Sequence, residues 1–290
     1  MIKNVLRYPG GKSKALDLII PKIPNNIQEF REPMAGGGSV SLAIKQLYPH
    51  VNIWINDLNY DLICFWKTLR DNPSELIDEI MRIKLTTTDG KKLFLELSNQ
   101  TDGTEFERAV RFFILNRISF SGTVDSGGYS QHAFERRFTI SAIEKLWEVS
   151  TIIKDFKITH GDYEPLLFEN GEKVFIFLDP PYYSTTKSKL YGKKGTLHTT
   201  FDHERFAQNV QKCPHLWLIT YDDCSEVRQI FSFAHIYPWE LQYGMTNYKQ
   251  PKARKGKELF ISNYPLHDIK EIQKPTRPTK THQEQLTFSW

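Results

Sequence analysis

One stretch decides the fold of this chain: Val174-Phe175-Ile176-Phe177-Leu178-Asp179-Pro180-Pro181-Tyr182. The apolar run before Asp179 is typical of a strand that is buried on both faces of a parallel sheet. Ligands of such sheets bind at the carboxyl ends of the strands, so we expect the polar residues after this run to face a site. The stretch therefore predicts an α/β fold with a site at the end of this strand.

The Asp-Pro-Pro-Tyr tetrapeptide at residues 179–182 also indicates what the site receives. Pro180 and Pro181 fix their φ angles and lack backbone N–H groups, which leaves the Asp179 side chain and the Pro180 carbonyl as acceptors. Two acceptors suit an amino group on a heteroaromatic ring, and Tyr182 offers a flat surface for that ring. A proline-rich turn that caps the strand, with Asp179 bonded to its own backbone, explains the tetrapeptide equally well.

A glycine-rich segment at residues 30–40, Phe-Arg-Glu-Pro-Met-Ala-Gly-Gly-Gly-Ser-Val, favours the site over the simple turn. It has the character of a strand end, a turn and a helix start, and its consecutive glycines let a ligand approach the backbone closely. The spacing is not G-x-G-x-x-G, and no Gly-Lys-Ser/Thr follows. Binding of a nucleotide phosphate is therefore disfavoured.

A second strand is predicted at residues 51–57, where alternating β-forming residues end in Asp57. An acid at the tip of the second strand of such a unit commonly holds a ribose diol. The residues from Asp57 to Asn59 can also supply the N-cap of the next helix, and the two roles are compatible.

Five motifs follow one another along the chain: residues 6–12 (Leu-Arg-Tyr-Pro-Gly-Gly-Lys), the glycine turn, residues 56–63 (Asn-Asp-Leu-Asn-Tyr-Asp-Leu-Ile), residues 115–117 (Leu-Asn-Arg) and the tetrapeptide. In these motifs the chain resembles the DNA adenine methyltransferases of the Dam type, which use S-adenosylmethionine (AdoMet). Residues 258–264 (Glu-Leu-Phe-Ile-Ser-Asn-Tyr) resemble the last strand of that family. The resemblance implies AdoMet as the cofactor and double-stranded DNA as the substrate.

The resemblance also implies roles for individual residues. Residues 32–38 are expected to surround the methionine part of AdoMet, Asp57 to hold its ribose, and Asp162 with Tyr163 to lie near its adenine, although a plain turn also explains the last two. The implied cofactor-binding residues are Tyr8, Gly11, Lys12, Glu32, Pro33, Ala35, Gly36, Gly37, Gly38, Asp57, Asp162, Tyr163 and Asp179. The implied catalytic residues are Asp179, Pro180, Pro181 and Tyr182.

The fold implied is a Rossmann-like methyltransferase sheet, mostly parallel, with an antiparallel edge formed by the last strands. Residues 1–64 and 151–266 are predicted to form the catalytic AdoMet-binding domain. Residues 65–150 break the alternation of strands and helices, which predicts a mostly helical inserted domain that recognises the DNA target. Residues 267–290 are polar and proline-bearing, which predicts a flexible tail.

The inserted segment departs from the family after Arg117. The family commonly has Phe-Asn-Gly followed by a basic residue, whereas residues 119–128 here are Ser-Phe-Ser-Gly-Thr-Val-Asp-Ser-Gly-Gly. Because this segment lies in the part expected to read DNA, the sequence leaves the recognition site undetermined.

Basic residues near the predicted site indicate where DNA binds. The net charge of +4 and the pI near 8.7 are only mildly basic, so clustering is more informative than the total. The lysines within residues 184–200 stand directly after the tetrapeptide with no acid among them; a solvated loop is the usual interpretation, but the position favours phosphate contact. The expected DNA-binding residues are Asn116, Arg117, Lys187, Lys189, Lys193 and Lys194.

Several classes of protein are disfavoured by composition. Cys64, Cys213 and Cys224 form no C-x-x-C pair, and the histidines show no metal-ligand spacing, so neither a disulfide framework nor a metal site is expected. No apolar run approaches the length of a membrane span, and the N-terminus lacks the long apolar region of a signal peptide. These features predict a cytoplasmic location without a membrane partner.

The predicted function is methyl transfer from AdoMet to the exocyclic amino group of an adenine that is flipped out of duplex DNA. Two alternatives remain: an amino-group methyltransferase that acts on cytosine N4, RNA adenine or a protein glutamine, and a relative that binds DNA but has lost the reaction. A cognate restriction endonuclease is a partner considered for such an enzyme.

The last residues, 283–290, place apolar side chains at the end of a polar tail. Such an ending indicates docking, either onto the body of the protein or onto a partner. Residues 285–288 (Gln-Leu-Thr-Phe) loosely resemble the peptides with which bacterial proteins bind the replication sliding clamp, and docking onto the protein's own body is favoured over the clamp.

Overall fold

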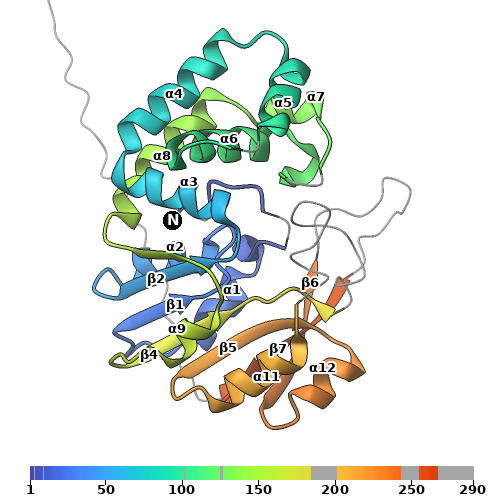
Figure 1. The fold of residues 1–290 in the computed structure, drawn as a ribbon. Coiled ribbons are helices and arrows are strands. Elements are labelled where there is room, and N and C mark those ends of the chain that lie inside the picture. Colours follow the sequence, from blue (N-terminus) through green and yellow to red (C-terminus); the bar gives the residue numbers. More distant parts are fainter. Residues whose placement is uncertain are drawn as a thin grey trace, which may run out of the picture.

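The computed structural model describes residues 1–2, 4–8, 10–100, 102–124, 127–183, 201–242 and 255–266. The described strands form a seven-stranded sheet in the order β3-β2-β1-β4-β5-β7-β6 (Figure 1). They are β1 (Glu29–Glu32), β2 (Asn52–Asp57), β3 (Lys157–His160), β4 (Val174–Leu178), β5 (Leu216–Asp222), β6 (His235–Gln242) and β7 (Lys255–Ser262).

The sheet is parallel from β3 to β5 and antiparallel at its other edge, where β7 pairs with β5 and β6. This arrangement confirms the predicted fold class and the predicted antiparallel edge. Pro238 lies in β6, the outer strand, where the lack of an N–H group removes no ladder hydrogen bond from the sheet interior.

Helices cover the sheet and extend away from it. They are α1 (Leu16–Ile19), α2 (Ser39–Leu47), α3 (Tyr60–Asp71), α4 (Pro73–Thr86), α5 (Gly90–Asn99), α6 (Glu105–Ile118), α7 (Gln131–Arg136), α8 (Ile140–Ile153), α9 (Glu164–Phe168), α11 (His203–Lys212) and α12 (Ser225–Ile230), with 3₁₀ turns at Lys12–Lys14, Ile20–Lys22 and Phe120–Gly122. Figure 1 shows α4 to α8 gathered beyond α3, on the side away from the sheet.

Local sequence explains where these helices begin. Asn59 caps α3 by accepting a hydrogen bond from the backbone N–H of Leu62. Thr104 and Glu107 form a capping box at the start of α6, so both side chains satisfy backbone N–H groups that the first turn leaves free.

The helical region shares its core with the sheet. Helix α3 crosses the predicted boundary at residue 64, and α8 crosses the one at residue 150. Phe65 of α3 stacks on Phe113 of α6 with ring centres 5.7 Å apart, and one continuous cluster of buried apolar residues contains both rings and sheet residues such as Phe30 and Phe175. The division into a catalytic and a recognition domain therefore stays a prediction about roles.

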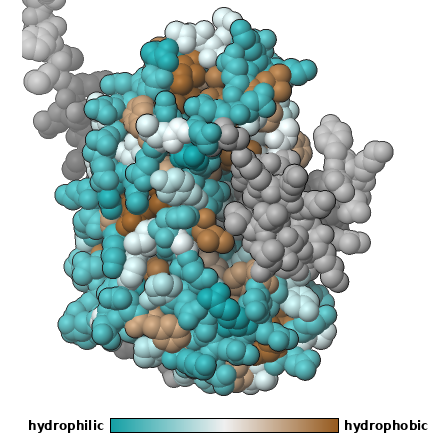
Figure 2. Space-filling model, in the orientation of Figure 1, coloured by the Kyte–Doolittle hydropathy of each residue, from teal (hydrophilic) through white to brown (hydrophobic). Residues whose placement is uncertain are grey.

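The face seen in Figure 2 is largely hydrophilic, with hydrophobic side chains in small separate groups, as expected when the apolar residues are used in that shared core. No helix in the described ranges is both long and apolar enough to cross a membrane. The lysines predicted to contact DNA at residues 187–194 and the tail at residues 267–290 lie outside the described residues.

Candidate active site

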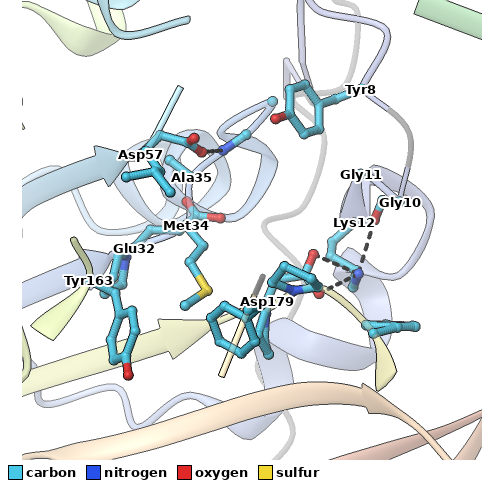
Figure 3. A pocket seen from close by; sticks show the side chains of 18 of the residues that line it. Tyr8, Gly10, Gly11, Lys12, Glu32, Met34, Ala35, Asp57, Tyr163 and Asp179 are labelled. Carbon is cyan, nitrogen blue, oxygen red and sulfur yellow. Dashed lines mark hydrogen bonds and ion pairs between the residues drawn. The ribbon is translucent and has the colours of Figure 1, made fainter. Parts of the chain in front are cut away.

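A cavity of about 660 Å³ opens at the carboxyl ends of the parallel strands. Figure 3 shows Lys12 between Gly10 and Asp179, with Asp57 across the cavity. All the residues predicted to bind the cofactor or to act in catalysis line this one cavity, although they come from segments far apart in the sequence; they are Tyr8, Gly11, Lys12, Glu32, Pro33, Ala35, Gly36, Gly37, Gly38, Asp57, Asp162, Tyr163, Asp179, Pro180, Pro181 and Tyr182.

The glycine turn connects β1 to α2 and packs against Tyr8. Gly36 has φ +49° and Gly38 has φ +63°. Residues other than glycine rarely adopt this left-handed backbone region. A Cβ atom on Gly36 would lie 2.8 Å from the Tyr8 ring, so a larger residue there would displace the tyrosine. The N–H of the Trp66 indole holds the turn from the other side by donating to the Gly36 carbonyl at 3.1 Å.

Asp57, at the end of β2, is tied to this turn. Its carboxylate accepts hydrogen bonds of 2.9 Å from the backbone N–H groups of Gly36 and Asn59. Burial raises the pKa of Asp57. The N-cap of α3 is Asn59 and not Asp57, so the two roles predicted for this segment fall on different residues.

Glu32 is a buried acid at the end of β1. Its carboxylate accepts hydrogen bonds from the backbone N–H of Ser41, at 3.0 Å, and from the Ser41 hydroxyl, which links β1 to α2. Burial raises the pKa of Glu32 to about 8, and the nearby carboxylates of Asp179 and Asp57 act in the same direction. This wall of the cavity therefore favours a positively charged ligand.

Asp179 follows β4, whose residues are all buried. Its carboxylate forms an ion pair with Lys12 at 2.6 Å and accepts a hydrogen bond of 2.8 Å from the Thr220 hydroxyl of β5. These contacts replace the predicted alternative in which Asp179 bonds its own backbone. Lys12 also donates to the Gly10 carbonyl at 2.9 Å. Lys12, which was predicted to bind the cofactor, is thus in direct contact with Asp179, which was predicted to act in catalysis.

Tyr182 stands beside this pair, in a cluster of aromatic and acidic side chains. Its ring stacks on Tyr221 with centres 6.0 Å apart, and its hydroxyl donates to Glu258 at 2.7 Å. The sequence offered a weak signal for Glu258, which is an acid inside a strand, and none for Thr220 as a partner of Asp179.

Asp162 and Tyr163 lie at another wall of the cavity. Asp162 accepts a hydrogen bond from the backbone N–H of Glu164 and pairs with Arg205 of α11 at 3.1 Å. The Arg205 guanidinium also lies 5.5 Å from the centre of the Tyr163 ring. The segment is thus a turn and part of the cavity wall at once, and Arg205 is a lining residue that sequence reasoning missed.

Asn116, one of the residues predicted to bind DNA, lies inside the helical core. Its side chain is fully buried and bonds the backbone of the N-terminal segment: it accepts from the Arg7 N–H and donates to the carbonyls of Arg7 and Gly122, at 2.9 to 3.0 Å. These backbone groups are sequestered from water and need partners, which explains why a polar side chain is kept inside.

Arg117, the next residue, belongs to an arginine cluster formed with Arg7 and Arg137. Its guanidinium lies 5.2 Å from the centre of the Phe113 ring and donates to the Val5 carbonyl. Burial, followed by the charges of Arg7 and Arg137, lowers the pKa of Arg117 to about 10. Among the described residues no carboxylate forms an ion pair with any of these three arginines.

Phe120 is next to this cluster in sequence and is 66 % exposed. It begins the 3₁₀ turn Phe120–Gly122, in which Ser121 has φ +56°. Its exposed fraction is larger than that of the other exposed aromatic side chains in the described residues, of which Trp147 at 43 % comes next.

Several carboxyl groups line the cavity, among them those of Glu32, Asp57 and Asp179. Within the described ranges, no group of three or more His, Cys, Asp and Glu side chains is arranged to hold a metal ion.

The chain is similar to known DNA methyltransferases over most of its length. The family described as D12 class N6 adenine-specific DNA methyltransferase matches residues 8–245. The type II methyltransferase M.MjaIII of Methanocaldococcus jannaschii is 26% identical over 69% of this chain and 75% of its own length. The type II methyltransferase M1.LlaDCHI of Lactococcus lactis is 28% identical over 72% and 74%, and the DNA adenine methylase of Vibrio cholerae is 25% identical over 80% and 85%.

Proposed function

Because the chain belongs to the D12 class of N6 adenine-specific DNA methyltransferases, which use AdoMet, we propose that it methylates an adenine flipped out of duplex DNA. The observation that carries this proposal is the position of Asp179 and Pro180, which stand at the end of β4 on the wall of a cavity lined by the glycine turn.

The residues of this cavity fit AdoMet. Its sulfonium and ammonium groups are positive, and Glu32, Asp57 and Asp179 contribute carboxyl groups to the cavity wall. The absence of a side chain at Gly36 lets the Tyr8 ring, which also lines the cavity, pack against the glycine turn. Residues 32–38 would hold the methionine part, Asp57 the ribose, and Asp162 with Tyr163 the adenine.

AdoMet supplies an electrophilic methyl group when bound. The Asp179 carboxylate and the Pro180 carbonyl accept the two hydrogens of the target amino group, which directs its nitrogen toward the methyl carbon. With AdoMet bound, the N–C bond would form as the C–S bond of the cofactor breaks, and the proton that the methylated nitrogen releases would pass to the Asp179 carboxylate that accepts its hydrogen bond. Lys12 and Thr220 hold the Asp179 carboxylate in place, so positioning and charge complementarity supply most of the rate enhancement.

The target base must leave the duplex because its amino group cannot reach a recessed cavity while it is stacked. Tyr182 offers the aromatic surface for the flipped base. Phe120 supports this proposal, because an exposed apolar side chain can enter the base stack and stabilise a distorted duplex.

The helical region between residues 65 and 150 supplies target recognition in this proposal. The arginine cluster supports it, since guanidinium groups bind phosphate oxygens well. Asn116 contributes by bonding the backbone of Arg7, and Arg117 is the predicted residue whose charge is available to the DNA backbone. The names of two relatives, both type II methyltransferases, support a restriction endonuclease of the same specificity as a functional partner.

A labelling experiment tests the proposed function. The protein is incubated with AdoMet labelled in its methyl group and with duplex DNA, single-stranded DNA, RNA or a protein extract, and the products are digested and separated. We expect label in N6-methyladenine, with duplex DNA as the best acceptor. Label in N4-methylcytosine, RNA or glutamine would refute the proposal in favour of another amino acceptor, and binding of DNA without transfer would indicate an inactive relative.

A further inference from the structure

Glu258 is a buried carboxyl group beside the predicted target-base subsite that the mechanism above does not use. It lies in β7 opposite Asp222 of β5, lines the cavity and is 1 % exposed. One carboxylate oxygen, Oε2, accepts the Tyr182 hydroxyl, whereas the other, Oε1, is buried without a hydrogen-bond partner among the described residues.

The bond from Tyr182 to Glu258 fixes the orientation of an aromatic ring at the cavity wall. One part of the ring packs on Tyr221, with centres 6.0 Å apart and an interplanar angle of 27°. A ring that is packed and also anchored at its hydroxyl cannot turn about its own axis or tilt without breaking one of these contacts. The Tyr182 surface therefore has one orientation relative to Asp179, which precedes it by three residues.

The acceptor of the Tyr182 hydroxyl is a carboxyl group, that of Glu258, and not a neutral side chain. A neutral acceptor would hold a tyrosine hydroxyl at a lower desolvation cost than a buried carboxylate does. Three carboxyl groups, those of Asp179, Asp222 and Glu258, line the cavity wall together with the ammonium groups of Lys12 and Lys257. Such a surplus of acids stabilises added positive charge, and methyl transfer moves a positive charge from sulfur to the target nitrogen.

We propose that Glu258 is a positioning residue for methyl transfer, which orients Tyr182 against the target base and adds negative charge on the side of the base. The inference rests on the proposed function, because the base is the group that Tyr182 would contact. Burial raises the pKa of Glu258 to about 7, while Lys12 and the Tyr182 hydroxyl oppose the shift. The ionised form accepts the hydroxyl best, so the methylation rate should rise with pH through this value.

The test compares Glu258→Gln with the wild type in single-turnover methylation of a duplex that the wild type modifies. Glutamine keeps the size and an acceptor oxygen but removes the charge. We expect the transfer rate to fall by about tenfold or more, while the dissociation constant for AdoMet changes by less than about twofold. We also expect the rise of the rate through pH 7 to disappear in the variant.

Asp223→Asn is the matched control, because it makes the same change of carboxylate to amide next to Asp222 in sequence, where Asp223 pairs with Arg228 and does not line the cavity. It should leave both the rate and its pH profile unchanged. A Glu258→Gln protein with the wild-type rate and profile would overturn the proposal, as would a loss explained entirely by weaker AdoMet binding.

Tyr182→Phe tests the same hydrogen bond from its donor side, and it keeps the proposal testable if the Glu258→Gln protein does not fold. It removes the hydroxyl but keeps the ring, so it should also slow transfer and flatten the pH profile. The double variant Tyr182→Phe/Glu258→Gln should transfer the methyl group no more slowly than the slower of the two single variants, because both substitutions break the same hydrogen bond. Additive losses, or a Tyr182→Phe enzyme with the wild-type rate, would contradict the proposal.

A wild type that does not methylate adenine refutes the proposed function itself, so failure of the proposed function is distinguishable from failure of the role of Glu258.

Discussion

Lys12 and Asp179 are 167 residues apart in the chain, and their side chains form an ion pair of 2.6 Å in the cavity. The pair joins the N-terminal motif to the end of β4. Because Asp179 is also held by Thr220, its carboxylate has a fixed position before any substrate arrives. Preorganisation of this kind is expected to matter more for the transfer step than for cofactor binding.

Asp179→Asn should therefore reduce the transfer rate by about a thousandfold, because an amide cannot provide the same two acceptor oxygens to the amino group and to Lys12. Single-turnover methylation with saturating AdoMet measures this rate. Asp223→Asn should retain full activity, which shows that the change of charge alone is harmless. An Asp179→Asn enzyme within about threefold of the wild type would remove Asp179 from the mechanism.

Gly36→Ala should destabilise the protein by about 1–3 kcal/mol and weaken AdoMet binding, because alanine disfavours a positive φ and its Cβ would clash with the Tyr8 ring. Chemical denaturation and calorimetric titration measure the two effects. Gly128→Ala is the control, since a Cβ at Gly128 would meet no atom within 4 Å. Equal behaviour of the two variants would contradict the role of the glycine turn.

Glu32 predicts a dependence of stability on pH. Its pKa of about 8 in the folded protein lies above the ordinary value of 4.5, so between these pH values the folded chain holds a proton that the unfolded chain releases. The free energy of unfolding should consequently fall as pH rises through this window, by at most about 1.4 kcal/mol per pH unit for this group.

Glu32→Gln should remove that contribution, because glutamine does not titrate. Denaturation curves between pH 5 and 8 would show a smaller fall for the variant than for the wild type. Glu172→Gln, at an exposed position, serves as the control and should behave like the wild type. A Glu32→Gln protein with the same slope as the wild type would show that other groups cause the pH dependence.

Arg137→Gln should weaken DNA binding and lower the salt dependence of the binding constant by about one unit of log–log slope if its guanidinium contacts a phosphate. Titrations at several salt concentrations give this slope. Arg82→Gln changes an exposed arginine that pairs with Glu79 and should leave the slope unchanged. Arg137 would be unrelated to DNA binding if both variants kept the wild-type slope.

Asn116→Ala should destabilise the protein by about 2–4 kcal/mol, because it leaves the buried N–H and carbonyl of Arg7 and the carbonyl of Gly122 without their partner. Thermal unfolding and DNA binding are measured together. A loss of DNA binding with unchanged stability would restore the expected direct contact, whereas a loss of stability supports the structural role.

The sequence by itself determined the chemical groups and the local elements of this protein. The apolar run of β4, the glycine turn and the acid that ends β2 could be predicted because each depends on neighbouring residues and on the short connections between them. The carboxyl ends of parallel strands lie on one edge, so the cavity at that edge followed from the same pattern.

The tertiary structure alone decided which side chains meet. Lys12 faces Asp179, Glu258 anchors Tyr182, and Asn116 is turned inward, and each of these contacts depends on how distant segments pack. No local pattern fixes such pairs, because the cost of burying a polar group is offset only by a partner that folding brings to it from elsewhere in the chain.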